Sequence, residues 1–144
     1  MSQLMLISIK QKYVDKILSG EKTIELRKSL PKIHPGDTIL IYTTQPVKAI
    51  TAFALAGEIV IYKPETMWRK YKSKLGISRQ DFFEYYGSSE RAIGIELLEV
   101  TKLDADILLS AIRAVSPKFS PPQTFRYISK YRSLKFYNAI NSNS

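Results

Sequence analysis

The stretch Gly20-Glu21-Lys22-Thr23-Ile24-Glu25-Leu26-Arg27 decides how this sequence is interpreted. From Thr23 to Arg27 polar and apolar side chains alternate, which is the period of a half-buried β-strand. On that strand Glu25 and Arg27 share one face, the apolar side chains face the core, and Lys22 lies where the strand begins. The sequence therefore predicts that three charged groups converge.

Two interpretations of these charges stay open on spacing alone. A glutamate between two cations stays ionised and orients the arginine, so Arg27 can present its donors to a phosphate or a base edge. The alternative is a ladder of salt bridges on an exposed strand, which contributes little to stability.

The flanking segments place this stretch in a β-rich domain. Leu4 to Ile9 is a short apolar run typical of a buried strand. Lys12 to Ser19 has helical spacing, and Gly20 is expected to end that helix as a left-handed cap. After the stretch, Pro35-Gly36-Asp37 predicts a turn into a strand at Thr38 to Thr43.

Further along, a long β-rich segment is followed by a helical pair. Lys48 to Tyr62 contains Gly57, which indicates a bulge or bend. Pro64 suits the first turn of a helix. Ser78, followed three residues later by an aspartate, resembles a capping box and predicts a second helix up to Gly87.

The C-terminal third is expected to contain one more strand and short helices. Ala92 to Thr101 is predicted as a strand, Leu103 to Val115 as holding a short helix, and the segment after Pro121-Pro122 as helical, because Phe125 and Ile128 fall on that spacing. We expect one domain over residues 1–137 and a flexible tail over 138–144.

This order of elements predicts an α+β fold. The strands do not alternate regularly with long helices, which argues against a doubly wound parallel sheet and for a small mixed β-barrel with flanking and inserted helices. No G-x-G-x-x-G loop is present, so a dinucleotide-binding fold is not supported.

Charge is the first indication of a partner. The 144 residues carry a formal charge of +9, which favours polyanions, nucleic acid before membrane. No acidic residue follows Asp106. Basic residues interleaved with aromatics fill the remainder, a pattern that suits phosphate neutralisation and base stacking but equally a solvated helix face. The cations of this remainder are Arg113, Lys118, Arg126, Lys130, Arg132 and Lys135.

Several classes of site are not supported by the composition. The chain has no cysteine and a single histidine, His34, so we expect no disulfide, no metal site and no cofactor. No window has the long uncharged apolar run of a membrane span, and Lys10 and Lys12 follow the N-terminal apolar run where a signal peptide would have its charges first. A cytoplasmic protein is expected.

The residues 7–28, ISIKQKYVDKILSGEKTIELRK, resemble the opening of ASCH domains in the PUA-like superfamily. The hallmark of these domains, G-x-K-x-x-E-x-R, is matched by Gly20, Lys22, Glu25 and Arg27. Weaker similarity extends over about residues 4–130 and includes the Pro-Pro-Gln segment at Pro121.

This resemblance implies a PUA-like β-barrel whose motif lines a cleft beside the early helix. ASCH domains are regarded mainly as RNA-binding, so RNA, single nucleotides or modified nucleobases are the implied partners. Some members are enzymes, one kind resembling a ribonuclease and another being an amidohydrolase that acts on N4-acetylcytidine.

The amidohydrolase function is doubtful for this chain. Its lysine is matched by Lys22, but its threonine falls at the position of Glu25, so Thr23 is not the matching nucleophile. Its distant glutamate has only Glu84 and Glu58 as candidates. Lys22 and Glu25 can still form an acid/base pair.

A ribonuclease needs less from the protein, because RNA carries its own nucleophile in the 2′-hydroxyl. A base, an acid and a cation suffice, and Glu25, Lys22 and Arg27 can fill these roles. Tyr42 is a further candidate for the cleft. His34, before Pro-Gly, is expected on an exposed turn.

Basic residues outside the motif are candidates for holding the RNA backbone. Arg69 and Lys70 are assigned this role on the first predicted inserted helix, whose Trp68 is expected to pack inward. Arg126 and Lys130 are assigned it near the C-terminus. The leading hypothesis is an RNA-binding module, with an enzyme on RNA or a modified nucleoside as the alternative. A protein partner remains the third.

Overall fold

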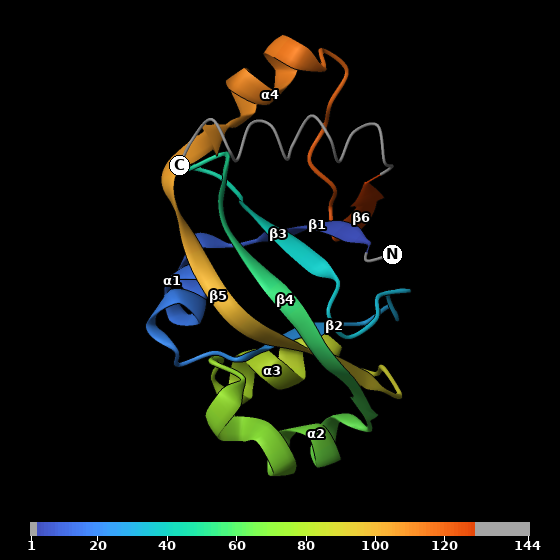
Figure 1. Cartoon of the computed structure of the whole chain (residues 1–144). Coiled ribbons are helices and arrows are strands. Elements are labelled where there is room, and N and C mark those ends of the chain that lie inside the picture. The colour runs from blue at the N-terminus through green and yellow to red at the C-terminus, as the bar shows by residue number, and fades with distance from the viewer. Residues whose placement is uncertain (1–2, 129–144) are drawn as a thin grey trace.

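The computed structural model describes residues 3–128, and these residues form one curled, mixed six-stranded sheet with four α-helices around it (Figure 1). The strands are β1 (Leu4–Ile9), β2 (Ile24–Arg27), β3 (Thr38–Thr43), β4 (Ala49–Tyr62), β5 (Ala92–Leu108) and β6 (Phe125–Ile128). The helices are α1 (Gln11–Ser19), α2 (Pro64–Tyr71), α3 (Arg79–Tyr86) and α4 (Leu109–Val115), with a 3-10 turn, η1, at Lys72–Lys74.

The sheet has the order β2-β5-β4-β3-β1-β6. Only the β1–β3 pair is parallel, and the other four pairs are antiparallel. The long β4–β5 pair shifts register at three places, one of them between Ala56 and Ile59, where Gly57 lies. Such bulges bend strands and increase twist, so they help the sheet to curl into a half-barrel. The predicted α+β barrel with inserted helices is confirmed.

Three apolar clusters hold the helices on this sheet. Val14 and Ile17 of α1 pack with buried residues of β1, β3, β4 and β5. A second cluster includes Ile112 of α4 and Phe119. A third joins β2 to α2 and α3, around the fully buried Phe82. Figure 1 shows α2 and α3 together at one end of the sheet and α4 at the opposite end.

The local signals around the motif act as the sequence predicts. Gly20 ends α1 with φ +86°, in the left-handed region that glycine adopts without strain. The chain then turns back, and Lys22 N–H donates to the Lys16 carbonyl oxygen at 3.0 Å. Pro64 opens α2, and Ser78 caps α3 by accepting from Asp81 N–H at 3.1 Å.

One prediction at the C-terminal end is wrong. Phe125 and Ile128, predicted on a helix, belong to β6, which pairs antiparallel with β1. There a neighbouring strand offers backbone hydrogen bonds that outweigh a weak local pattern. The short helix predicted within Leu103 to Val115 is confirmed as α4, and Leu103 to Leu108 before it continue β5. Lys130 and residues 138–144 lie outside the described residues.

Candidate functional site

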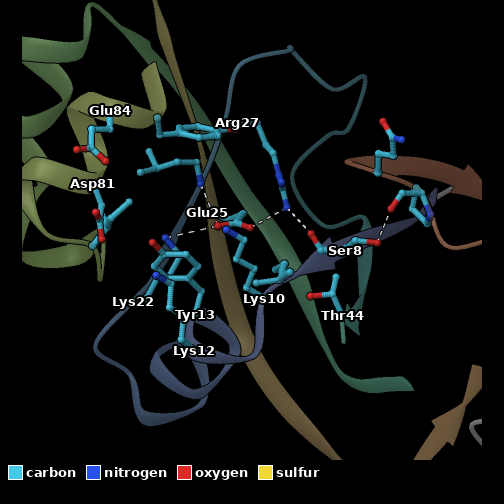
Figure 2. Close-up of a pocket in the computed structure, with 16 residues that line it drawn as sticks. Ser8, Lys10, Lys12, Tyr13, Lys22, Glu25, Arg27, Thr44, Asp81 and Glu84 are labelled. Carbon is cyan, nitrogen blue, oxygen red and sulfur yellow. Dashed lines mark hydrogen bonds and ion pairs between the residues drawn. The ribbon is translucent and has the colours of Figure 1, made fainter. Parts of the chain in front are cut away.

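A cavity of about 670 Å³ lies beside β2, between α1 and α3 (Figure 2). Its size is within the range of sites for small ligands. Every charged residue of the motif lines it, together with residues from β1, α1, α3 and the Pro122-Gln123 segment. The four cations on its wall are Lys10, Lys12, Lys22 and Arg27, and the three carboxylates are Glu25, Asp81 and Glu84.

Lys22 is held from three sides on the wall of this cavity. Its residue is only 2% exposed. Nζ donates to the Leu75 carbonyl oxygen at 2.7 Å, lies 3.5 Å from Glu25 Oε1, and sits 5.4 Å from the centre of the Tyr13 ring. Burial lowers the pKa of Lys22 from its usual 10.5, and attraction to Glu25 opposes that shift. The amine is therefore easier to deprotonate than an exposed lysine.

Glu25 lies between the two cations of the motif. Its Oε2 accepts from Arg27 Nη2 at 2.8 Å, and its Oε1 accepts from the backbone N–H of Leu26 at 3.1 Å. The glutamate side chain is 8% exposed and that of Arg27 is 12% exposed. The charges are thus a buried cluster and not the exposed ladder that was the alternative interpretation. Removing the glutamate from this cluster would leave two buried cations without their counter-ion.

Arg27 joins β2 to β1 on the wall of the cavity. Its Nη2 also donates to the Ser8 carbonyl oxygen at 2.9 Å, and Ser8 Oγ donates to the Pro122 carbonyl oxygen at 2.6 Å. Among the described residues, Arg27 Nε is the one buried side-chain polar atom with no hydrogen-bond partner. The guanidinium therefore keeps donor capacity that the protein does not use.

Aromatic and carboxylate groups of α3 form the opposite side of the cavity. Burial raises the pKa of Tyr85, and nearby Arg27 lowers it in part, so the phenol stays protonated at neutral pH. The neighbouring Tyr86 hydroxyl donates to the Arg27 carbonyl oxygen at 3.1 Å. Figure 2 shows Asp81 and Glu84 on α3, across from Arg27 and Ser8.

The helical segment between β4 and β5 belongs to this site. Leu75 supplies the carbonyl that binds Lys22, and Ile77 lines the cavity with the α3 residues. Sequence reasoning gave Leu75 and Ile77 no role in the site, and among the α3 residues of the cavity it named only Glu84, as a candidate for the distant glutamate of an amidohydrolase. The capping box at Ser78 located the helix, but no signal in the sequence placed the preceding Leu75 against Lys22, which lies 53 positions earlier.

Other predicted site residues lie elsewhere. Tyr42 is 3% exposed and packs in the cluster with Ile112, so it does not line the cavity. Arg69 and Lys70 are exposed on α2, with Lys70 Nζ 5.4 Å from the centre of the Tyr62 ring. Arg126 is on β6, over the Phe119 ring. Lys130 is outside the described residues.

Three further sequence-based predictions concern a metal site, a membrane span and the position of His34. Within residues 3–128, no three histidine, aspartate or glutamate side chains are grouped so that they could hold a metal ion. No helix in the same range is long and apolar enough to span a membrane. His34 is exposed on its turn, with Nδ1 3.9 Å from Asp37 Oδ2.

Comparison of the sequence and the fold with known proteins points to one family. The sequence pattern of the ASCH domain matches residues 7–104. A Zymomonas mobilis protein named ASCH domain-containing ribonuclease is 30% identical over 129 residues, which are 90% of this chain and 86% of that protein.

Solved structures agree with this match. The crystal structure of ASCH from Zymomonas mobilis has a TM-score of 0.88 at 28% identity, covering 94% of each chain. The N-terminal domain of Staphylothermus marinus McrB shares the fold, with a TM-score of 0.61 at 15% identity, over 100% of this chain and 96% of that domain.

Proposed function

The chain belongs to the ASCH domain family, and we propose that it binds single-stranded RNA in the cavity and cleaves it there. One observation carries the proposal: Lys22, Glu25 and Arg27 form a single ion cluster on the wall of a cavity large enough for a nucleotide. The ribonuclease name of the Zymomonas mobilis relative supports the choice of RNA as substrate.

The proposed chemistry uses the nucleophile that RNA carries. A base takes the proton of a 2′-hydroxyl, the oxygen attacks the adjacent phosphorus, and the 5′-oxygen leaves with a proton. The products are a 2′,3′-cyclic phosphate and a 5′-hydroxyl. Glu25 is the candidate base, and Lys22 is the candidate acid, because burial lowers its pKa and makes its proton easier to give up. Arg27 offers donors to the phosphorane charge.

A second function, RNA binding without cleavage, is favoured by how fully the cluster is satisfied. Lys22 Nζ and both Glu25 oxygens already have protein partners, and both residues are almost completely buried. A site of this kind can bind a nucleotide through Arg27 and the cavity walls while its charges serve to position the arginine.

The amidohydrolase function lacks its nucleophile, although Glu84, one candidate for the distant glutamate, lines the cavity with Lys22. Thr23 does not line the cavity, and its backbone N–H and carbonyl are engaged with Lys74 and Leu97. The position of the threonine nucleophile is held by Glu25, which has no hydroxyl.

The test is cleavage of end-labelled single-stranded RNA on a denaturing gel, with EDTA present to silence metal-dependent contaminants. We expect products that end in a 2′,3′-cyclic phosphate, and none from RNA that is 2′-O-methylated throughout. A Lys22→Met variant should be inactive, and a Lys102→Met variant, which changes an exposed lysine outside the cavity, should cleave normally. Intact RNA with tight binding would favour the binding module, and equal cleavage by both variants would contradict the site.

A further inference from the structure

A group of exposed cations lies in the first part of the helical insertion between β4 and β5. We define the basic segment as residues 63–79, which include α2, η1 and the cap of α3. It contains six cations and one acid, Glu65, a net charge of +5, and the acids Asp81 and Glu84 follow it on α3. All six cations are exposed: Lys63, Arg69, Lys70, Lys72, Lys74 and Arg79.

These cations are not neutralised by carboxylates, although Arg79 lies over the Phe83 ring at 5.0 Å. In the described part of the chain, none of the six takes part in an ion pair, since the pairs there involve Lys22, Arg27, His34 and Lys102. Exposed like charges so close in sequence repel one another, an arrangement that costs stability unless a polyanion neutralises it.

Aromatic rings lie beside the cations. Lys70 Nζ is 5.4 Å from the centre of the Tyr62 ring, and the Tyr62 and Tyr71 rings are 6.1 Å apart. Both tyrosines are half-buried, whereas Trp68 is engaged with Phe82 at 5.3 Å. Cations next to partly exposed rings are the combination by which proteins bind single-stranded nucleic acid.

The basic segment is continuous with the cavity. The Lys74 carbonyl oxygen accepts from Thr23 N–H at 2.9 Å, the next carbonyl, that of Leu75, holds Lys22, and Ile77 lines the cavity. The cavity itself has four cations and three carboxylates, so it offers little net attraction for a polyanion. The attraction for a nucleic acid backbone must come largely from outside the cavity.

We propose that the basic segment binds the part of a single-stranded RNA that flanks the nucleotide in the cavity, with phosphates on its cations. This inference rests on the proposed function, and it adds a second contact surface, outside the cavity, for the flanking nucleotides of the RNA strand.

The test compares two uncleavable 2′-O-methyl RNAs, a trimer and a dodecamer, by fluorescence anisotropy. The variant Arg69→Gln/Lys70→Gln/Lys72→Gln removes three cations of the basic segment. The control Lys32→Gln/Lys48→Gln/Lys118→Gln removes three exposed cations outside both the segment and the cavity. Both variants lose three positive charges, so a difference in their RNA affinities shows that the position of the cations matters and not only the net charge.

We expect the basic-segment variant to bind the dodecamer about tenfold more weakly or worse at low salt, with the slope of log K against log[salt] shallower by about 2. Its affinity for the trimer and the control's affinity for both RNAs should stay within about twofold of wild type, since steering by net charge alone is weak at these separations. Equal losses in the two triple variants, or no loss in the first, would overturn the inference. If wild type bound neither RNA, the proposed function itself would fail.

Discussion

The backbone carbonyl of Leu75 accepts a hydrogen bond from Lys22 Nζ at 2.7 Å, so an inserted helical segment holds the buried amine of the motif. The backbones of the same two residues also form an isolated antiparallel bridge. The chemistry of the motif therefore depends on a segment 53 residues away, and changes in that segment should reach the site.

Gly76 tests this dependence. Its φ is +57°, and a Cβ there would lie 2.6 Å from Lys22 Cβ. Gly76→Ala should lower the free energy of unfolding by about 2 kcal/mol or more, from backbone strain plus the clash, and reduce RNA cleavage. Gly36→Ala is the matched control, since its φ is +92° but no atom would lie within 4 Å of the new Cβ. Denaturant unfolding that gave equal losses for both variants would argue against the contact.

The ion cluster predicts an unequal response to removal of its members. Glu25→Gln leaves Lys22 and Arg27 buried without their counter-ion, which should cost about 3–5 kcal/mol of stability. Lys22→Met should cost less, because Glu25 keeps Arg27 and the Leu26 N–H, and a desolvated amine is removed.

The control for that comparison is the exposed Lys102–Asp106 pair, at 2.7 Å. Asp106→Asn should cost less than about 1 kcal/mol. Urea unfolding of the three variants gives the order of their free energies of unfolding. A Glu25→Gln variant as stable as Asp106→Asn would show that the cluster is not buried in solution.

Alkaline pH should destabilise the fold through its tyrosines. Burial raises the pKa of five of them above the usual value of 10.0, Tyr86 the most. Above pH 10 the unfolded chain loses phenolic protons that the folded chain keeps, so the free energy of unfolding should fall as pH rises. The lowered pKa of Lys22 acts in the opposite direction, but only up to about its usual 10.5.

Thermal unfolding between pH 8 and pH 11.5, with phenolate absorbance recorded in parallel, checks this prediction. Tyr86→Phe should weaken the pH dependence above pH 10.5, although it also loses the hydrogen bond to the Arg27 carbonyl. Stability that rose steadily above pH 10.5 would contradict the assignment.

Many elements of the fold can be predicted from local sequence signals. The apolar runs at Leu4–Ile9 and Thr38–Thr43 form strands with those bounds, and Gly20, Pro64 and Ser78 mark helix ends as predicted. Each of these signals acts through its own neighbours in the chain. The strand at Phe125–Ile128 could not be predicted in this way, because its stabilising partner is β1, more than 100 residues earlier.

The candidate site divides in the same way. The convergence of Lys22, Glu25 and Arg27 follows from alternation on a short strand and a family motif. The burial of these three side chains could not be predicted from the sequence. It depends on α2 and α3, which pack on the apolar face of β2, and on residues of β1, α1 and α3, which surround the charged face at the cavity. Tyr42 was a candidate because the sequence does not reveal toward which side of β3 the cavity opens.

The central proposal is that an RNA nucleotide occupies this cavity. Ultraviolet crosslinking of labelled, uncleavable single-stranded 2′-O-methyl RNA, followed by mass spectrometry of the crosslinked peptides, tests that claim most directly. Tyr13 and Tyr85 are the aromatic residues on the cavity wall. We predict crosslinks at one or both tyrosines, lost when excess unlabelled RNA competes and strongly reduced in an Arg27→Met variant. Crosslinks confined to residues outside the cavity, such as those of β6 and α4, would contradict the account.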